Sequence, residues 1–350
     1  MSAMTPAARG DDVHGDAWAR GARADHAVNV ATGGPPPWLR ILLRDALEHA
    51  VAAYPDEREA QLAVACRHGR APGEVVMLNG AAQGFALIAA ALGARRPVVV
   101  HPQFTEPDRA LATAGRPARH LVLSDPYSLD PDAVPDDADL VVVGNPTNPT
   151  GVLHPRAAIE AIIKPGRVLV VDEAFMDFVP GEAESVAAAA GVEGLIVLRS
   201  LTKILAVPGL RVGYLLAPAA LARRLREQRH AWPVNALALL AARAAATQPE
   251  RLEPIAERAQ RDRAALHHAL VRDLAGTVHV HPGAANFLLT RHRGVDATAL
   301  ARRLRERHGI AVRPAATFPG LTAHHLRLTA RGGDADARLV AALRDEAPEG

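Results

Sequence analysis

The lysines are the first residues of this sequence that suggest a chemistry. The chain has 350 residues with 40 Lys plus Arg, and its lysines are Lys164 and Lys203. A lysine amine can form a Schiff base with a carbonyl compound, whereas an arginine guanidinium stays protonated and cannot. Lys164 precedes a Pro-Gly pair, which is typical of a solvated turn. Lys203 is therefore the candidate for covalent chemistry at an amine.

Further polar or small residues follow the predicted strands. Continuous apolar runs predict buried strands at 75–78, 97–101, 140–144, 168–171 and 195–198. The residues that follow them are, in chain order, Gly80, Ala81, Ala82, Phe104, Asn148, Asp172, Ser200, Thr202 and Lys203. Ligands of doubly wound sheets bind beyond the carboxyl ends of the strands. We therefore expect these residues to form one site.

These residue types match the needs of pyridoxal 5′-phosphate (PLP). Lys203 offers the amine for the aldehyde of PLP, and Asp172 offers a carboxylate that keeps the pyridine nitrogen protonated. The Asn148 amide can donate to the 3-oxygen, and Phe104 can stack on the ring. Helix N-terminal amides, hydroxyls and a guanidinium bind phosphate. The candidates for that part are Ala81, Ala82, Ser200, Thr202 and Arg211.

Each of these residues also has a simpler explanation. An aspartate at a strand end is commonly a turn or cap residue, and the sequence NPTNPTG at 145–151 is rich in turn formers. Phe104 alone would be a core residue, and Arg211 alone a surface charge. The hypothesis of a PLP site therefore depends on the ordered set and on no single member.

The order of the predicted elements indicates an α/β fold. Further strands are expected at 120–123 and 213–216, with helices at 39–53, 56–68, 80–92, 106–114 and 156–163. Apolar strands alternating with helices predict a mostly parallel sheet covered on both faces. The later elements are helices at 219–230, 235–247, 249–274, 297–308 and 335–343 and strands at 285–290 and 326–329, which form a smaller α+β lobe.

These elements divide the chain into three parts. Residues 1–40 form an N-terminal segment, irregular as far as 35, that packs with the small lobe. Residues 41–248 form the large PLP-binding domain, and 249–350 the small α+β domain.

Composition narrows the class of protein. Charged residues make up 22%, aromatic residues 3%, and the net charge is +2, which is unlike a nucleic-acid-binding surface. A single cysteine, Cys66, excludes an internal disulfide and a Cys-cluster metal site. The sequence shows neither a signal peptide nor an apolar run of membrane-spanning length. We expect a cytoplasmic protein with no nucleic-acid or membrane partner and no metal in its site.

Four motifs make the chain resemble a known superfamily. They are NPTNPTG (145–151), DEAF (172–175), SLTK (200–203) and GLRVGY (209–214). The sequence is similar to fold type I PLP-dependent enzymes of the class I/II aminotransferase superfamily, from about His14 to Leu343. The resemblance implies a PLP cofactor, a large α/β domain with a smaller lobe, and a homodimer.

Two branches of the superfamily are similar to this chain. They are histidinol-phosphate aminotransferase and the L-threonine-O-3-phosphate decarboxylase of cobalamin synthesis. Pro208 and the stretches 172–180 and 232–238 resemble the decarboxylase more. The expected reaction is therefore decarboxylation of L-threonine O-3-phosphate to (R)-1-aminopropan-2-yl phosphate for cobalamin biosynthesis. The alternative is transamination of histidinol phosphate or a similar phosphorylated amine, and a non-catalytic PLP-fold protein is a third reading.

The resemblance also implies residue roles. Lys203 would be the Schiff-base lysine and Asp172 the partner of the pyridine nitrogen. Tyr54 would reach the cofactor phosphate of the neighbouring subunit, and Arg327 would bind the substrate carboxylate. The residues implied at the substrate are Arg327, Asn148, His14 and Asn29.

The chain departs from the superfamily pattern near the substrate. Phe175 stands where many aminotransferases have a tyrosine, and the segments around His14 and Asn29 differ from the decarboxylase branch. These departures concern the substrate more than the cofactor. Which bond at the substrate's Cα breaks depends on how Arg327 orients the substrate.

Overall fold

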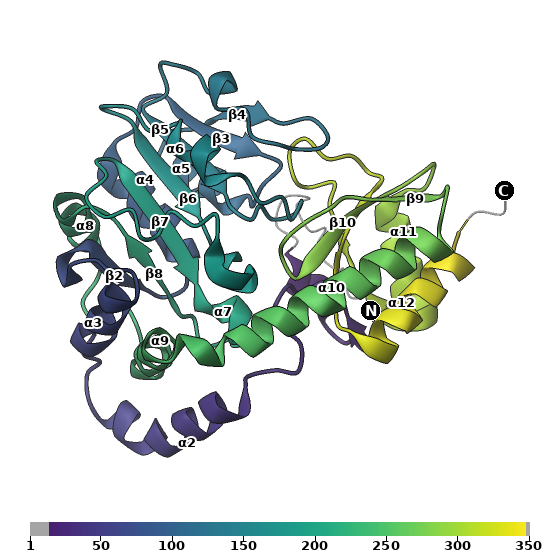
Figure 1. Ribbon diagram of the computed structural model, residues 1–350, viewed down its shortest axis with the longest axis horizontal. Helices are drawn as coiled ribbons and strands as arrows, with labels where there is room; N and C mark the ends of the chain where they lie inside the picture. Colours follow the sequence, from purple (N-terminus) through teal and green to yellow (C-terminus); the bar gives the residue numbers. More distant parts are fainter. Residues whose placement is uncertain (1–13, 348–350) are drawn as a thin grey trace, which may run out of the picture.

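The computed structural model describes residues 14–347, and its largest element is a seven-stranded sheet (Figure 1). Its strands are β2 (Val75–Leu78), β3 (Pro97–His101), β4 (Arg119–Val122), β5 (Leu140–Gly144), β6 (Val168–Asp172), β7 (Leu195–Ser200) and β8 (Gly213–Leu216). Their order is β2-β8-β7-β6-β5-β3-β4, and only β8 runs antiparallel to its neighbours. The predicted α/β class with a mostly parallel sheet is confirmed.

Helices cover both faces of this sheet, because its strands are apolar on both sides. In β2, Val75 and Met77 belong to one core, whereas Val76 and Leu78 belong to the other. The first core includes residues of α2 (Pro37–Ala52), α3 (Arg58–Arg67), α6 (Arg156–Glu160) and α9 (Ala236–Thr247). The second includes residues of α4 (Ala82–Leu92), α5 (Glu106–Thr113) and α8 (Ala219–Arg226).

A second, four-stranded sheet forms the smaller lobe. It is antiparallel, in the order β12 (Arg313–Pro314), β13 (His325–Thr329), β10 (Phe287–His292) and β9 (Val278–Val280). The helices α10 (Glu253–Asp273), α11 (Ala297–Arg303) and α12 (Gly333–Asp345) share an apolar core with one face of this sheet. Figure 1 shows α10 running from the large sheet to the small lobe. The other face turns towards the large sheet, since Leu289 packs with Tyr127.

The N-terminal segment is more regular than expected. Residues 1–35 were expected to be irregular, but α1 (Gly15–Ala19) and β1 (Ala24–Asp25) lie within them. β1 pairs in parallel with β11 (Ile310–Ala311) of the small lobe. Such a strand has no periodicity of its own, because a partner almost 300 residues away in sequence defines it. The domain boundaries at 40 and 248 stay a prediction.

Several predicted elements differ at their ends. The helix expected at 219–230 ends at Arg226, and the one expected at 249–274 starts as a 3-10 turn, Pro249–Arg251, before α10. The helix expected at 297–308 changes after α11 to a π-helical turn, Leu304–His308, and the strand expected at 285–290 is β10. Proline in the first turns of 249–251 and α10 explains the break there, because proline has no N–H to donate. Across the described residues, no helix combines the length and apolar character needed to span a membrane.

A buried ion network joins the ends of two central strands. Arg199, near the end of β7, is fully buried, and its Nε lies 3.1 Å from an oxygen of Glu173, which follows β6. Its Nη1 lies 3.4 Å from Asp177, and Glu182 pairs with its Nη2. Burial raises the pKa of Glu173 to about 7 and also raises that of Asp177. The guanidinium therefore compensates carboxylates that water does not reach.

Replacing Arg199 by methionine should destabilise the fold strongly. Arg199→Met leaves Glu173 and Asp177 buried without their cation, which typically costs about 3–5 kcal/mol. The free energy of unfolding from urea titration measures this loss. Arg258→Met is the matched control, because Arg258 is 57% exposed on α10 and its loss should change stability by about 0.5 kcal/mol or less. Equal stabilities of the two variants would contradict the role of the network.

Candidate active site

Lys203 and Asp172 lie at the same edge of the large sheet. Asp172 ends β6, and Lys203 lies on the short helix α7 (Leu201–Ile204) that follows the neighbouring strand β7. Burial, aided by the charges of Arg327 and Arg211, lowers the pKa of the Lys203 amine to about 8. Burial likewise raises the pKa of Asp172 to about 6. Both side chains remain partly exposed, so a ligand can reach a nucleophilic amine beside a carboxylate.

A cradle for an anion lies next to this pair. Gly80 has φ +80°, and a Cβ there would lie 2.4 Å from Nη2 of Arg211, so the guanidinium lies against the start of α4. Ser200 Oγ and Thr202 Oγ1 lie 2.7 Å apart. Arg211 adopts φ +61°, a left-handed conformation that is uncommon for a non-glycine residue. Helix amides, two hydroxyls and a guanidinium are the donor set that a phosphate requires.

Arg327 is the second basic group at the site. It lies on β13 and is buried, and its Nη1 donates to Asn148 Oδ1 at 2.7 Å. Its Nη2 donates to the carbonyl oxygen of Ala27, and its Nε is buried without a partner. Burial and the charge of Arg313 lower the pKa of Arg327 to about 9. Since Arg327 occupies the amide oxygen of Asn148, the NH₂ of that amide is the end that can serve a ligand.

The N-terminal segment closes over these residues. A Cβ on Gly15 would lie 2.7 Å from the Ala27 oxygen and 3.4 Å from Arg327 Nη2, so only glycine fits there. The ring centroid of the preceding residue, His14, lies 6.1 Å from that of Phe104. The backbone N–H of Ala31 donates to the carbonyl oxygen of Lys203 at 2.8 Å. Residues 14–31 thus contact both the lysine and the arginine of the site.

Within residues 14–347, the contacts of two predicted site residues, Asn29 and Tyr54, are with groups other than these. Asn29 is buried, and the contact of its backbone oxygen is with Asn286 Nδ2 at 3.4 Å. Tyr54 is 77% exposed, and its ring stacks on Trp232 with the centroids 4.3 Å apart. An exposed tyrosine at the surface is suited to a partner subunit and not to the Lys203 of its own chain. Both roles stay proposals.

Arg313 is a basic residue of the site that sequence reasoning missed. It is the cross-strand partner of Arg327 between β12 and β13, it is buried, and its Nη2 donates to Thr317 Oγ1 at 2.9 Å. Burial lowers its pKa to about 10, against the opposing charge of Asp16. β12 has only two residues, so its pairing with β13 left no periodic signal in the sequence.

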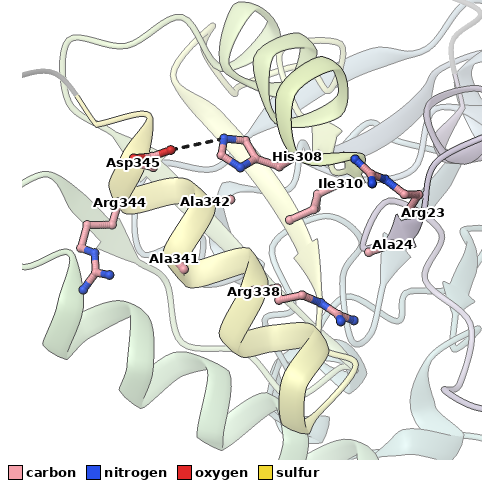
Figure 2. A pocket seen from close by; sticks show the side chains of 9 residues that line it. All are labelled: Arg23, Ala24, His308, Ile310, Arg338, Ala341, Ala342, Arg344 and Asp345. Atoms are coloured by element: carbon pink, nitrogen blue, oxygen red, sulfur yellow. Dashed lines mark ion pairs between the residues drawn. The ribbon is translucent and has the colours of Figure 1, made fainter.

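A separate groove lies on the small lobe (Figure 2). It has a volume of about 720 Å³, and its charged lining residues are Arg23, His308, Arg338, Arg344 and Asp345. The three arginines are exposed, and His308 is held by Asp345 and Glu346. Among the described residues, those that line the groove include none of the predicted site residues.

Comparison with known proteins identifies the family. The family model described as aminotransferase class I and II matches residues 26–343. A histidinol-phosphate aminotransferase of Mycobacterium tuberculosis is 47% identical over 322 residues, which cover 91% of this chain and 86% of that protein. The threonine-phosphate decarboxylase of Salmonella typhimurium is 34% identical over 333 residues, covering 92% and 90%.

A solved structure supports the same fold. Histidinol-phosphate aminotransferase from Sinorhizobium meliloti in complex with pyridoxal-5′-phosphate superposes with a TM-score of 0.83 at 23% identity, covering 99% of this chain and 97% of that one. The amine, the carboxylate and the anion cradle described above fit the cofactor of the family. The chain belongs to the class I and II aminotransferases, and it is a PLP-dependent enzyme.

Proposed function

We propose that the chain is an aminotransferase acting on histidinol phosphate or a similar phosphorylated amine. The observation that carries the proposal is the 47% identity, over 91% of the chain, to a protein named histidinol-phosphate aminotransferase. Identity to the threonine-phosphate decarboxylase is lower, at 34%. The preference drawn from the sequence motifs, which favoured decarboxylation, is thereby reversed.

The two buried arginines support a phosphorylated substrate. Arg313 and Arg327 are directly paired positions of neighbouring strands, and within residues 14–347 neither forms an ion pair with a carboxylate. The opposing charges of Asp16 and Asp25 act on them without forming an ion pair, so the two buried cations are incompletely compensated, which favours an anionic ligand. A phosphate carries enough charge and acceptor oxygens to bind both guanidinium groups.

The other residues of the site would bind the cofactor, orient the substrate and transfer its proton. When bound, PLP takes up the electrons of the bond that breaks at the substrate's Cα. Asp172 would hold a proton at the pyridine nitrogen of PLP, and the cradle at Gly80, Ser200 and Arg211 would anchor the phosphate of the cofactor. The Lys203 amine, with its pKa near 8, removes and returns the Cα proton. Arg327 fixes the substrate so that this hydrogen faces Lys203.

Decarboxylation of L-threonine O-3-phosphate, a step of cobalamin biosynthesis, is the second candidate. It is favoured by the 34% identical decarboxylase and by Pro208, whose backbone oxygen accepts a hydrogen bond from Arg211 at 3.1 Å. The two reactions would use the same residues and differ in which bond at the substrate's Cα breaks. A small change in the substrate's orientation at Arg327 is enough to exchange them.

We also propose that the chain forms a homodimer and is located in the cytoplasm. Large apolar residues are exposed on and after α2, including Val51 at 71%, with Tyr54 and Trp232 beside them. A surface of this kind favours burial against another chain. The free Cys66 agrees with a reducing compartment.

Lys203→Ala should abolish covalent attachment of PLP. The variant should lose the yellow absorbance of the bound cofactor, and borohydride reduction followed by peptide mass spectrometry should find no modified lysine. Lys164→Ala is the matched control, because Lys164 is exposed and pairs with Asp136. The control should keep a single modification, at Lys203. A modification at Lys164 in the wild-type chain would contradict the assignment.

Arg313→Met should weaken the binding of phosphorylated substrate. Loss of a charge-assisted hydrogen bond to phosphate corresponds to a rise in KM of about 10- to 100-fold. The KM for the same amine without its phosphate should change little, because that amine has no phosphate for the Arg313 guanidinium to bind. Arg302→Met, at an exposed position of α11, should leave both values unchanged. An equal loss for both substrates would argue against a phosphate contact at Arg313.

The products distinguish the two reactions. Incubation with histidinol phosphate and 2-oxoglutarate should give glutamate, detected by mass spectrometry. Incubation with phosphothreonine should release no CO₂. Release of CO₂ from phosphothreonine without glutamate formation in the first reaction would overturn the aminotransferase proposal in favour of the decarboxylase.

A further inference from the structure

We propose that Asp125, His279 and His281 form a binding site for a divalent transition-metal ion of the Zn²⁺ type. Each offers one ligand atom, and the three atoms lie within 4.8 Å of one another. Two imidazoles and a carboxylate, with water as a fourth ligand, are a common coordination set for zinc. The site lies outside the PLP centre, and the motifs of the sequence gave no reason to expect it.

The strand geometry places the three side chains together. His279 and His281 are two residues apart at β9, so both project from the same face of the small sheet. This face turns towards the large sheet, and Asp125 reaches it from the loop after β4. Tyr127, two residues beyond Asp125, packs on the same face, with its ring centroid 5.3 Å from that of His281. The site therefore joins a loop of the large sheet to a strand of the small one.

The cluster lacks the hydrogen bonds that would explain it without a metal. His281 is 2% exposed, and its Nε2 is buried without a hydrogen-bond partner among residues 14–347. Its Nδ1 lies 3.5 Å from Asp125 Oδ1, too far for a good hydrogen bond. That distance is close to the spacing of about 3.4 Å between two ligands of a tetrahedral zinc ion.

A second group of similar composition serves as a contrast. His101, Asp108 and His120 also gather their ligand atoms within 4.8 Å. There the two carboxylate oxygens of Asp108 lie 2.8 Å from His101 Nε2 and 3.0 Å from His120 Nε2. His120 Nε2 and Asp108 Oδ1 form a hydrogen bond. Oδ2 lies close to His101 Nε2, but both atoms are buried without a hydrogen-bond partner among the described residues. The two clusters differ in the distance of the carboxylate, because Asp125 lies 3.5 Å from His281, further than Asp108 lies from either of its imidazoles.

Two further residues lie near the proposed metal site: His325, which could favour metal binding, and Arg291, whose positive charge opposes it. His325 lies on the same face, with its ring centroid 6.0 Å from that of His281, and its buried Nε2 also has no partner. Arg291 is the cross-strand neighbour of both His279 and His325, and its charge lowers the pKa of His281. A cation must bind against this guanidinium, which is exposed. Removing that charge should strengthen metal binding.

The proposal is tested with the full-length, tag-free PLP enzyme, freed of metal with a chelator. Titration with Co²⁺ should give the visible absorption of a tetrahedral site at one ion per chain, and Zn²⁺ should displace it. His279→Ala and Asp125→Asn should weaken binding at least tenfold. Arg291→Met should tighten it several-fold. In differential scanning calorimetry, Zn²⁺ should raise the Tm of the wild-type chain but not that of the two weakened variants.

Two control variants locate the site. His120→Ala removes a ligand of the contrasting group, and His268→Ala removes an exposed histidine of α10, so both should bind Co²⁺ as the wild type does. The proposal is overturned if the wild type binds no Co²⁺ at micromolar concentration. It is equally overturned if His279→Ala and Asp125→Asn bind normally, or if His120→Ala alone abolishes binding. Normal PLP absorbance in every variant confirms that the fold and the cofactor site are intact.

Discussion

The salt bridge between Arg199 and Glu173 is the contact on which the active site depends. Arg199 precedes Ser200 by one residue, and Glu173 follows Asp172 by one residue. The two charged residues are fully buried and lie 3.1 Å apart, and their neighbours in sequence are the candidate site residues Ser200 and Asp172. The pair thus fixes the ends of β7 and β6 relative to one another. Because neither charge can be solvated, the carboxylate and the amine of the site are held in place by groups that never touch a ligand.

Much of this arrangement could be predicted from the sequence. Residues that follow apolar strands must meet at one edge of a parallel sheet, and the structure places Gly80, Asn148, Asp172 and Lys203 there. Arg211 and Phe104 are also where the motifs indicated, against Gly80 and His14. Local pattern and motif spacing are sufficient for these positions, because each is fixed by the strand next to it in sequence.

Other features required the three-dimensional pairing. Arg313 lies on a two-residue strand, and the partner of β1 is almost at the other end of the chain. Nothing in the sequence distinguishes Arg199 from the other arginines, although in the structure it is fully buried among three carboxylates. Short strands and long-range ion pairs leave no periodic signal, because their partners are distant in sequence. The choice between the two reactions stays a proposal for a related reason: it depends on the substrate pocket and not on the cofactor motifs.

The direction of β8 has a wider consequence. In a purely parallel sheet every ligand-binding residue comes after its strand, and the chain before each strand lies at the far edge. β8 is antiparallel to both β2 and β7, so its beginning lies at the cofactor edge. Arg211, which precedes β8, therefore joins Gly80, Ser200 and Thr202, which come after or at the end of their strands. Because one strand is reversed, side chains that precede a strand and side chains that follow a strand can lie together at the same edge of the sheet.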